Sequence, residues 1–159
     1  MKFKFTTLLL LVLLQSFYIK AQESETPENI IILIGDGMGV NFVSASVLSL
    51  DNCPFRNFTT VGLSVTCAAD KLITDSAAGA TAIATGYRTN YYYVSVDRGG
   101  EPLKTLFEHA EELGYSTGVV VTSTVTHATP AAFLAHVKNR KDESEIALQF
   151  LEQGVDVVI

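Results

Sequence analysis

One segment combines residue types that could attack a phosphate, because Asp75 and Ser76 stand in the run TDSAAGAT at residues 74–81. The small residues predict a helix that starts at the serine. Its first turn would offer free backbone N–H groups and the positive end of the helix dipole, which suit a phosphate or a developing oxyanion. A serine hydroxyl is a weak nucleophile at neutral pH unless a base or a metal activates it, and no histidine lies nearby in the sequence. Ser76 is therefore either a nucleophile that needs an activator or an ordinary helix N-cap.

A carboxylate follows the first apolar run of the mature chain, at a turn rich in glycine. Residues 29–34 read NIIILI, and Asp36 lies in the turn GDGMG at residues 35–39. The glycine spacing fails the dinucleotide-binding pattern, because Val40 stands where the last glycine belongs. Divalent cations favour oxygen ligands, so Asp36 is a candidate metal ligand. An Asx-turn or a helix cap is the alternative role for this side chain.

A third loop, residues 123–130, carries an imidazole and a hydroxyl two residues apart. His127 and Thr129 each have an ordinary alternative role, the first as a hydrogen-bonded loop residue and the second as a helix N-cap. Arg140 follows the helix that this loop opens. A guanidinium suits bidentate recognition of a phosphate, although a single arginine is more often a solvated surface charge. Taken by itself, this third loop leaves its function open.

These loops need a scaffold that brings them together, and the apolar patterning predicts an α/β fold. Continuous β-branched runs are typical of strands buried on both faces, and segments bounded by Gly or Pro with a helical period are typical of helices. The alternation indicates a mostly parallel central sheet flanked by helices, in which functional groups gather outside the carboxyl ends of the strands. Strands are expected at residues 29–34, 117–122 and 155–159, strand-forming residues at 59–66, helices at 40–50, 76–85, 103–113, 130–137 and 143–153, and an exposed connection at 90–100.

Three segments, taken together, resemble one family. NIIILIGDGMG at residues 29–39 resembles the opening strand and metal turn of the alkaline phosphatases, and TDSAAGATA at residues 74–82 is similar to their nucleophile signature. Residues 127–140, from HATPAA to HVKNR, match the third segment of the family in residue type and spacing. The resemblance extends from residue 29 to the end of the chain, and it implies an alkaline-phosphatase-like fold that is incomplete here.

The resemblance implies a metal-dependent phosphomonoester hydrolase and identifies an activator for the serine. In this family two zinc ions activate the nucleophile, and one magnesium ion lies close by. Asp36 would bridge one zinc and the magnesium. Ser76, bound to zinc, would attack phosphorus and become a phosphoserine. The substrates would be small phosphomonoesters.

The same resemblance assigns roles to four further residues. Arg140 would hold two oxygens of the phosphate, and Asp75 would orient it. Thr129 would ligate the magnesium through its hydroxyl. His127 stands where the best-known bacterial pattern has an acidic residue, and the resemblance assigns His127 to the metal site. The remaining metal ligands of the family belong to its C-terminal half, so they are expected beyond residue 159 and residues 1–159 alone are expected to be inactive.

The chain is expected to be the N-terminal part of an exported protein. Two early lysines, the apolar run at residues 8–14 and a small residue at position 21 predict a signal peptide over residues 1–21, with an uncleaved membrane anchor as the alternative. Residues 22–28 are predicted to be a flexible mature N-terminus, and residues 29–159 the N-terminal portion of a single catalytic domain. The predicted location is therefore periplasmic or extracellular, with no stable membrane span once the leader is removed.

Composition limits the partners of the chain. The net charge is −6 without a basic run, which disfavours binding to nucleic acids. A homodimer is compatible with the sequence. Cys53 and Cys67 could form a disulfide in an oxidising compartment, or they could be two buried thiols.

Two alternative functions remain open at the level of sequence. Other members of the superfamily act on phosphodiesters, sulfate esters or sugar phosphates. A non-catalytic, exported protein that binds metal or phosphate would belong to a different class. The joint presence of Asp36, Ser76, Thr129 and Arg140 favours an enzyme over a binding protein.

Overall fold

The computed structural model of the chain describes residues 27–159. The predicted signal peptide and most of the predicted flexible N-terminus lie outside the described residues, so both stay predictions. The chain divides into two units, residues 1–34 and residues 35–159. Within the described residues, no helix is both long and apolar enough to cross a membrane.

The predicted first strand does not form. Residues 29–34 have no regular secondary structure, and Ile30 and Leu33 are 79% and 89% exposed. A strand buried on both faces needs hydrogen-bonded neighbours at its edges and helices over its faces. Among residues 27–159, the sheet consists of two other strands that pair with each other. The β-branched composition of residues 29–34 therefore gives extended backbone here, without burial.

The helix that carries the candidate nucleophile forms where the sequence predicts it. Helix α3 spans Ser76–Thr85, and Asp75 is its N-cap, with a side chain that accepts a hydrogen bond from the backbone N–H of Ala78 at 3.1 Å. Gly86 ends the helix at φ +77°, a left-handed conformation that glycine adopts without steric cost. Asp75, and not Ser76, thus caps the helix, which leaves the serine hydroxyl free for other contacts.

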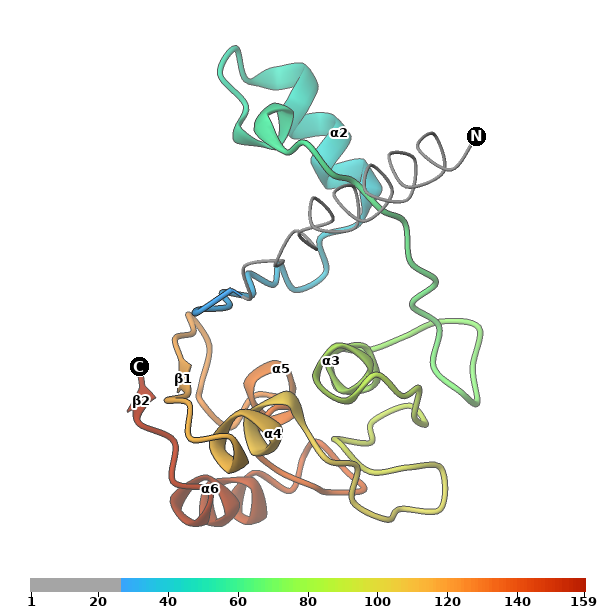
Figure 1. Cartoon of the computed structure of the whole chain (residues 1–159). Coiled ribbons are helices and arrows are strands. Elements are labelled where there is room, and N and C mark those ends of the chain that lie inside the picture. The colour runs from blue at the N-terminus through green and yellow to red at the C-terminus, as the bar shows by residue number, and fades with distance from the viewer. Residues whose placement is uncertain (1–26) are drawn as a thin grey trace, which may run out of the picture. The chain divides into compact units, whose positions relative to one another are not determined.

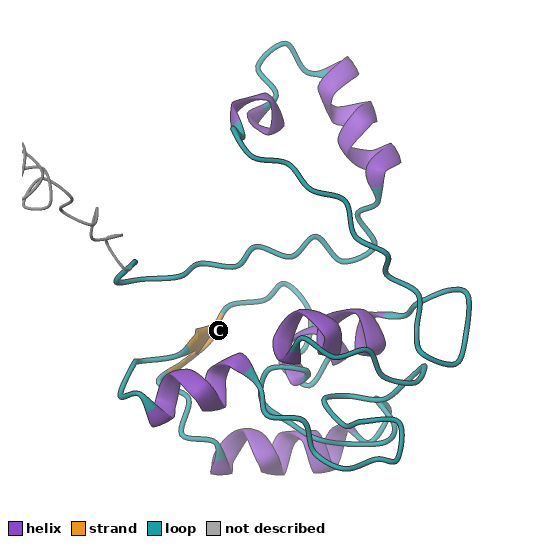
Figure 2. Cartoon of the chain, turned by 45° about the vertical axis from the view of Figure 1, so that its right-hand side comes forward, coloured by secondary structure: helices purple, strands orange, loops and turns teal. Residues whose placement is uncertain are grey.

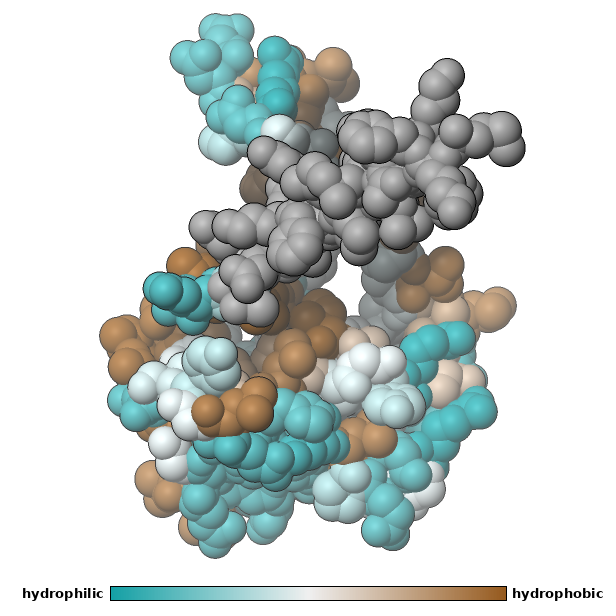
Figure 3. Space-filling view, in the orientation of Figure 1, coloured by the Kyte–Doolittle hydropathy of each residue, from teal (hydrophilic) through white to brown (hydrophobic). Residues whose placement is uncertain are grey.

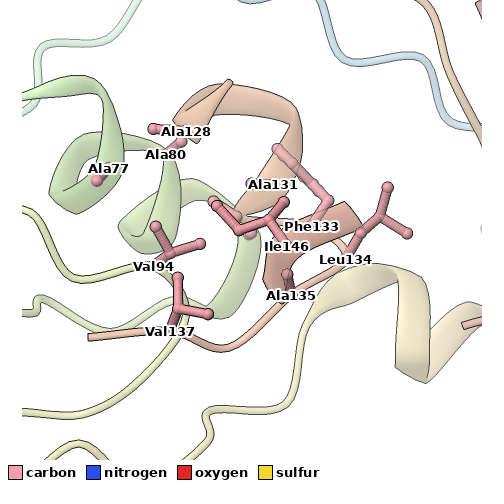
Figure 4. Close-up of a cluster of buried hydrophobic side chains, with 12 residues drawn as sticks. Ala77, Ala80, Val94, Ala128, Ala131, Phe133, Leu134, Ala135, Val137 and Ile146 are labelled. Carbon is pink, nitrogen blue, oxygen red and sulfur yellow. The ribbon is translucent and has the colours of Figure 1, made fainter. Parts of the chain in front are cut away.

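Small residues let helix α3 pack closely against helix α5, Ala128–Ala131 (Figure 1). The facing side chains are mostly alanines, among them Ala77 and Ala80 of α3 and Ala128 and Ala131 of α5 (Figure 4). This contact joins the loop before α3 to the loop before α5, the two segments that hold most of the candidate site. The buried cluster around it comprises Ala77, Ala80, Ala84, Val94, Ala128, Ala131, Ala132, Phe133, Leu134, Ala135, Val137 and Ile146.

Two further helices, α4 and α6, flank this core. Helix α4, Leu106–Glu112, starts later than predicted, because Thr105 and Glu108 form a capping box at its N-terminus. Pro102, predicted at the helix start, instead forms an isolated antiparallel bridge with Val96. Helix α6, Glu143–Glu152, closely matches its predicted range and buries Ile146.

The sheet is shorter than the apolar runs suggest. Strands β1, Gly118–Val119, and β2, Val157–Val158, pair in parallel, with Gly118 opposite Val157 (Figure 2). The parallel pairing matches the prediction of an α/β fold. The predicted ranges 117–122 and 155–159 are only partly paired, and β2 is exposed on the surface. The structure is therefore a partial α/β fold, with helices around a small parallel sheet.

The segment between the first glycine-rich turn and α3 is largely exposed. Helix α2, Val40–Ser49, forms as predicted and packs against the short 3-10 helix η1, Pro54–Asn57. Residues 59–66 form no strand, and Val61 and Leu63 are exposed, as is Leu72 further along. Figure 3 shows hydrophobic side chains at the surface among hydrophilic ones. The two cysteines, Cys53 and Cys67, are free thiols.

The connection after α3 is not wholly exposed, contrary to the prediction for residues 90–100. Val94, Ser95 and Val96 are buried, and Val94 forms an antiparallel bridge with Val137. Thr89 is also buried and donates its hydroxyl to the carbonyl oxygen of Val96 at 2.6 Å. This loop is therefore part of the support beneath the candidate site.

Candidate active site

The glycine-rich turn places a carboxylate at the start of helix α2. The backbone N–H of Met38 donates to the carbonyl oxygen of Gly35 at 3.0 Å, and Gly37 has φ +73°. Glycine adopts this left-handed conformation readily, whereas a side chain there would be strained. Asp36 lies in the middle of this turn, with a side chain that is 46% exposed. The turn thus presents the carboxylate at the surface.

Two hydroxyls from distant parts of the chain converge on this carboxylate. Ser76 Oγ donates to Asp36 Oδ1 at 3.0 Å, and Thr129 Oγ1 donates to Asp36 Oδ2 at 2.9 Å. Thr129 is not the N-cap of helix α5, because His127 occupies that position. The threonine hydroxyl is therefore available to the site, and one residue from each of the three loops meets at Asp36.

His127 lies between the carboxylate and Arg140. Its Nε2 is 3.0 Å from Arg140 Nη2, while its Nδ1 is 3.4 Å from the backbone N of Thr129 and 3.9 Å from Asp36 Oδ2. A neutral imidazole has one acceptor nitrogen, so both short contacts cannot be hydrogen bonds at once. The guanidinium of Arg140 and the backbone N–H of Thr129 can each only donate, so the tautomer decides which of the two ring nitrogens accepts. Asp36 Oδ2, at 3.9 Å, lies beyond hydrogen-bond distance of Nδ1.

Arg140 is anchored on the residue before the serine. Its Nη1 donates to Asp75 Oδ2 at 3.0 Å, and the Asp75 side chain is only 7% exposed. The other carboxylate oxygen, Oδ1, accepts the N–H groups of Ala78 and Tyr92 at 3.1 and 3.3 Å. Hydrogen bonds to a nearly buried carboxylate fix its position, and the carboxylate in turn fixes the guanidinium. Asp75 is thus placed to orient Arg140, which itself is 20% exposed.

The oxygen donors at Asp36 suit a hard divalent cation. One carboxylate and two hydroxyls come together, and oxygen ligands are the kind that Mg²⁺ prefers. Zinc in proteins usually takes three or four ligands drawn from Cys, His, Asp and Glu. Among residues 27–159, no three such side chains are grouped so that they could hold a metal ion. The donor set fits one magnesium ion and is too small for two zinc ions.

The other two histidines lie away from this donor set. His136 Nδ1 contacts the carbonyl oxygen of Ser95 at 2.6 Å, and its Nε2 is 3.2 Å from Glu108 Oε1. Partial burial raises the pKa of Glu108. The hydrogen bond from the N–H of Thr105 and the nearby His136 together lower the pKa by a larger amount, so it lies below its ordinary value. His109 lies in the last turn of helix α4. These contacts tie α4 to the loop beneath the site.

Sequence reasoning missed the support from the loop after α3. Tyr92 donates its backbone N–H to Asp75 and accepts the backbone N–H of Arg140 at 2.9 Å. Thr81, on α3, accepts the N–H of Ser95 at 2.8 Å through its hydroxyl, and Ser95 donates its own hydroxyl to the carbonyl oxygen of Ala132. The tyrosine run and the single serine of this loop give no local signal for such contacts, because the contacts are made to residues far along the chain.

Comparison with known proteins places the chain in a family. The family model described as Alkaline phosphatase matches residues 27–157. Alkaline phosphatase 4 of Bacillus subtilis is 37% identical over 146 residues, which cover 86% of this chain and 32% of that protein. Streptomycin-6-phosphate phosphatase of Streptomyces griseus is 43% identical over 122 residues, which cover 70% of this chain and 27% of that protein.

Solved structures agree with the sequence matches. The alkaline phosphatase of the Antarctic bacterium TAB5 matches with a TM-score of 0.80 and 39% identity, over 84% of this chain and 39% of that one. A His-to-Asp variant of the TAB5 enzyme, with Mg bound in its M3 site, matches with the same TM-score.

The fold and the three converging loops are those of a partial alkaline-phosphatase-like α/β fold. The chain belongs to the alkaline phosphatase family. It spans about a third of the length of the curated relatives that it matches: it covers 32% of Alkaline phosphatase 4 and 30% of Alkaline phosphatase 3 of Bacillus subtilis.

Proposed function

We propose that the full-length protein hydrolyses phosphomonoesters, with Ser76 as the nucleophile that becomes a phosphoserine. The observation that carries the proposal is the convergence of the Ser76 and Thr129 hydroxyls on the two oxygens of Asp36, at 3.0 and 2.9 Å. Arg140 lies beside this cluster, held on the residue that precedes the serine. Membership of the alkaline phosphatase family supports the same class of reaction.

In the proposed reaction, Ser76 Oγ attacks phosphorus in line with the ester oxygen. A bond forms between Oγ and phosphorus while the bond to the leaving oxygen breaks, and that oxygen takes up a proton to leave as an alcohol. The proton of Ser76 Oγ, which is hydrogen-bonded to Asp36 Oδ1 before the reaction, passes to solvent water, and solvent water supplies the proton that the leaving oxygen takes up. Water then cleaves the phosphoserine, which releases inorganic phosphate and returns a proton to the serine.

Arg140 binds the phosphate during both steps. A guanidinium has five N–H donors, and Arg140 directs one toward Asp75 and one toward His127. The remaining donors are free to bind two nonbridging oxygens of the phosphate. The planar fork of the guanidinium suits this bidentate contact better than the point charge of a lysine would.

The proposed metal content is two zinc ions and one magnesium ion. Divalent cations, when bound, lower the pKa of a serine hydroxyl and stabilise the charge on a leaving oxygen. Asp36 would ligate zinc and magnesium, Thr129 magnesium and Ser76 zinc, with His127 beside the magnesium. The zinc ions need ligands beyond those of the described residues, and we place these ligands beyond residue 159.

A comparison of two proteins tests this proposal. The full-length protein, supplied with zinc and magnesium, is expected to hydrolyse 4-nitrophenyl phosphate much faster than bis(4-nitrophenyl) phosphate or 4-nitrophenyl sulfate. Residues 27–159 alone, with folding checked by circular dichroism, are expected to show neither turnover nor bound zinc. Normal turnover by this fragment would contradict the placement of the missing ligands. Preference of the full-length protein for the diester or the sulfate would assign it to another activity of the superfamily.

Asp75→Asn is expected to lower kcat/KM for a phosphomonoester by about tenfold, because it removes the charge that anchors Arg140. A hydrogen-bonded pair of charges contributes more than a neutral pair, by about 1–2 kcal/mol. Asparagine still caps helix α3, so the melting temperature should change little. Steady-state kinetics and a thermal melt of the full-length variant measure both quantities. A drop in melting temperature that parallels the loss of activity would show a structural role instead.

A further inference from the structure

A hydrogen bond outside the candidate site joins the loop before helix α5 to the start of helix α6. Thr126 Oγ1 donates to Glu143 Oε2 at 2.8 Å, and Glu143 is the first residue of α6. The hydroxyl of Thr124 lies 3.3 Å from the same Thr126 oxygen. A threonine hydroxyl has a single proton and a carboxylate is the stronger acceptor, so Thr126 donates to Glu143 and can accept from Thr124. The proposed reaction uses neither Thr126 nor Glu143.

This hydrogen bond fixes the position of the loop. Ser123 donates its hydroxyl to the carbonyl oxygen of Thr124, and the N–H of His127 donates to the same oxygen, so both of these bonds are local. Among residues 27–159, only the bond from Thr126 to Glu143 joins residues 122–126 to a residue outside 122–127. A segment whose other hydrogen bonds are local can shift relative to the core when such a bond is lost.

Both ends of the bond adjoin residues of the candidate site. Thr126 precedes His127, which is the N-cap of α5 and lies 3.0 Å from Arg140 Nη2. Thr129, in the first turn of the same helix, donates its hydroxyl to the carboxylate of the glycine-rich turn at 2.9 Å. On the other side, Glu143 comes shortly after Arg140 in the chain. The bond therefore ties the segment that carries His127 and Thr129 to the segment that carries Arg140.

Glu143 also has an ordinary structural role to compare with this one. An acid in the first turn of a helix interacts favourably with the helix dipole, and α6 has two such acids, Glu143 and Glu145. The interaction with the dipole needs the charge of Glu143 and does not involve Thr126. The tether needs the hydroxyl of Thr126 and an acceptor oxygen at position 143, but not a charge there. The two roles therefore predict different outcomes for different substitutions.

We propose that Thr126 and Glu143 are positioning residues, whose hydrogen bond holds His127 and Thr129 where a magnesium ion can use them. This inference rests on the proposed phosphatase function. Magnesium demands near-ideal octahedral geometry, so a small displacement of a ligand weakens its binding. Ser76 is placed by helix α3 instead. Loss of the tether should therefore weaken magnesium binding and leave the chemical step intact once the metal is bound.

Magnesium binding by the full-length protein tests this inference without turnover. Isothermal titration with magnesium chloride measures the Kd of the protein after dialysis to remove magnesium. Thr126→Val keeps the shape of the side chain without the hydroxyl, and it is expected to raise this Kd about fivefold, the size of one hydrogen bond at a partly exposed position. Thr126→Ser keeps the hydroxyl and Glu143→Gln keeps an acceptor oxygen, so both should keep the Kd of the wild-type protein. Glu152→Ala removes an exposed glutamate at the end of the same helix and is the matched control.

Kinetics and a double-mutant cycle complete the test. In Thr126→Val, the magnesium concentration for half-maximal hydrolysis should rise by the same factor, with kcat at saturating magnesium unchanged. Thr126→Val combined with Glu143→Ala should bind magnesium no more weakly than the weaker single variant, because both substitutions remove the same bond. Thr126 is partly exposed and Glu143 is exposed, so the variants should fold, which a thermal melt checks.

The outcomes separate this inference from the proposed hydrolysis. An unchanged Kd in Thr126→Val overturns the positioning role, as does a wild-type protein that binds no magnesium. A Kd that rises in Glu143→Gln but not in Thr126→Val would assign Glu143 to the helix dipole alone. A protein whose magnesium binding responds as expected, but which hydrolyses no phosphomonoester, would keep the positioning role and overturn only the proposed function.

Discussion

Replacing Ser76 with alanine is expected to lower the kcat of the full-length protein by a factor of about 10⁴ or more, as the loss of a nucleophile does in other covalent enzymes. Alanine has no oxygen that could attack phosphorus, so the phosphoserine cannot form. The fold should be unaffected, because Asp75 still caps helix α3 and alanine favours helix. The measurements are steady-state kinetics, and mass spectrometry of the protein quenched in acid during turnover.

The control for this variant is Ser49→Ala. Ser49 is an exposed serine at the end of helix α2, and its replacement should leave both kcat and the phosphopeptide unchanged. The phosphorylated peptide of the wild-type protein should contain Ser76 and disappear in Ser76→Ala. A phosphopeptide that maps elsewhere, or a Ser76→Ala variant with near-normal kcat, would refute the proposed nucleophile.

Asp36→Asn is expected to have the second-largest effect, a loss of about 10³-fold in kcat/KM, which corresponds to several kcal/mol of lost stabilisation by a bound metal. The amide keeps the shape of the side chain but removes its charge and weakens it as a metal ligand. The content of magnesium and zinc should fall together with activity. Inductively coupled plasma mass spectrometry of the purified full-length protein measures both metals without any need for turnover.

Asp51→Asn is the matched control, because Asp51 is an exposed aspartate just after helix α2. It should retain both its metal content and its activity. High concentrations of magnesium should partly restore the activity of Asp36→Asn, since a weaker ligand raises the concentration of metal needed for occupancy. An Asp36→Asn variant with unchanged metal content would mean that the carboxylate acts only through its hydrogen bonds to Ser76 and Thr129.

Helices and their ends could be predicted from the sequence because their signals are local. Helix α3 begins and ends at the predicted residues, where a run of small residues lies between an acid and Gly86. Its hydrogen bonds join residues four apart, and its cap uses a neighbouring side chain. Helix α4 is the exception, since the reciprocal bonds of Thr105 and Glu108, and not the proline before them, set its start.

Strands could not be predicted as well, because a strand exists only beside another strand. The run at residues 29–34 has the composition of a buried strand, yet it is exposed and unpaired in the described part of the chain. β1 and β2 pair over two residues each, although both apolar runs are longer. The amino-acid composition of a segment indicates whether it can form a strand. Hydrogen bonds to a neighbouring strand, distant in the sequence, decide whether the strand forms.

The sequence by itself determined the types of the reactive groups and the loops that carry them. Asp36, Ser76, His127, Thr129 and Arg140 could all be selected by residue type, spacing and resemblance to the alkaline phosphatases. Only the tertiary structure decided how they meet. Thr129 reaches a carboxylate 93 residues earlier in the chain, and it can do so because the small residues of α3 and α5 let the two helices pack closely.

Tertiary structure alone also revealed the role of the loop after α3. The left-handed backbone of Tyr92 has no signature in a run of three tyrosines, and the contacts that hold it there come from Asp75 and Arg140. Such a conformation is unfavourable for the isolated segment by about 1–2 kcal/mol, so it persists only where the surrounding structure fixes it. Local energetics therefore specified the helix that carries the serine, and long-range contacts specified the site around it.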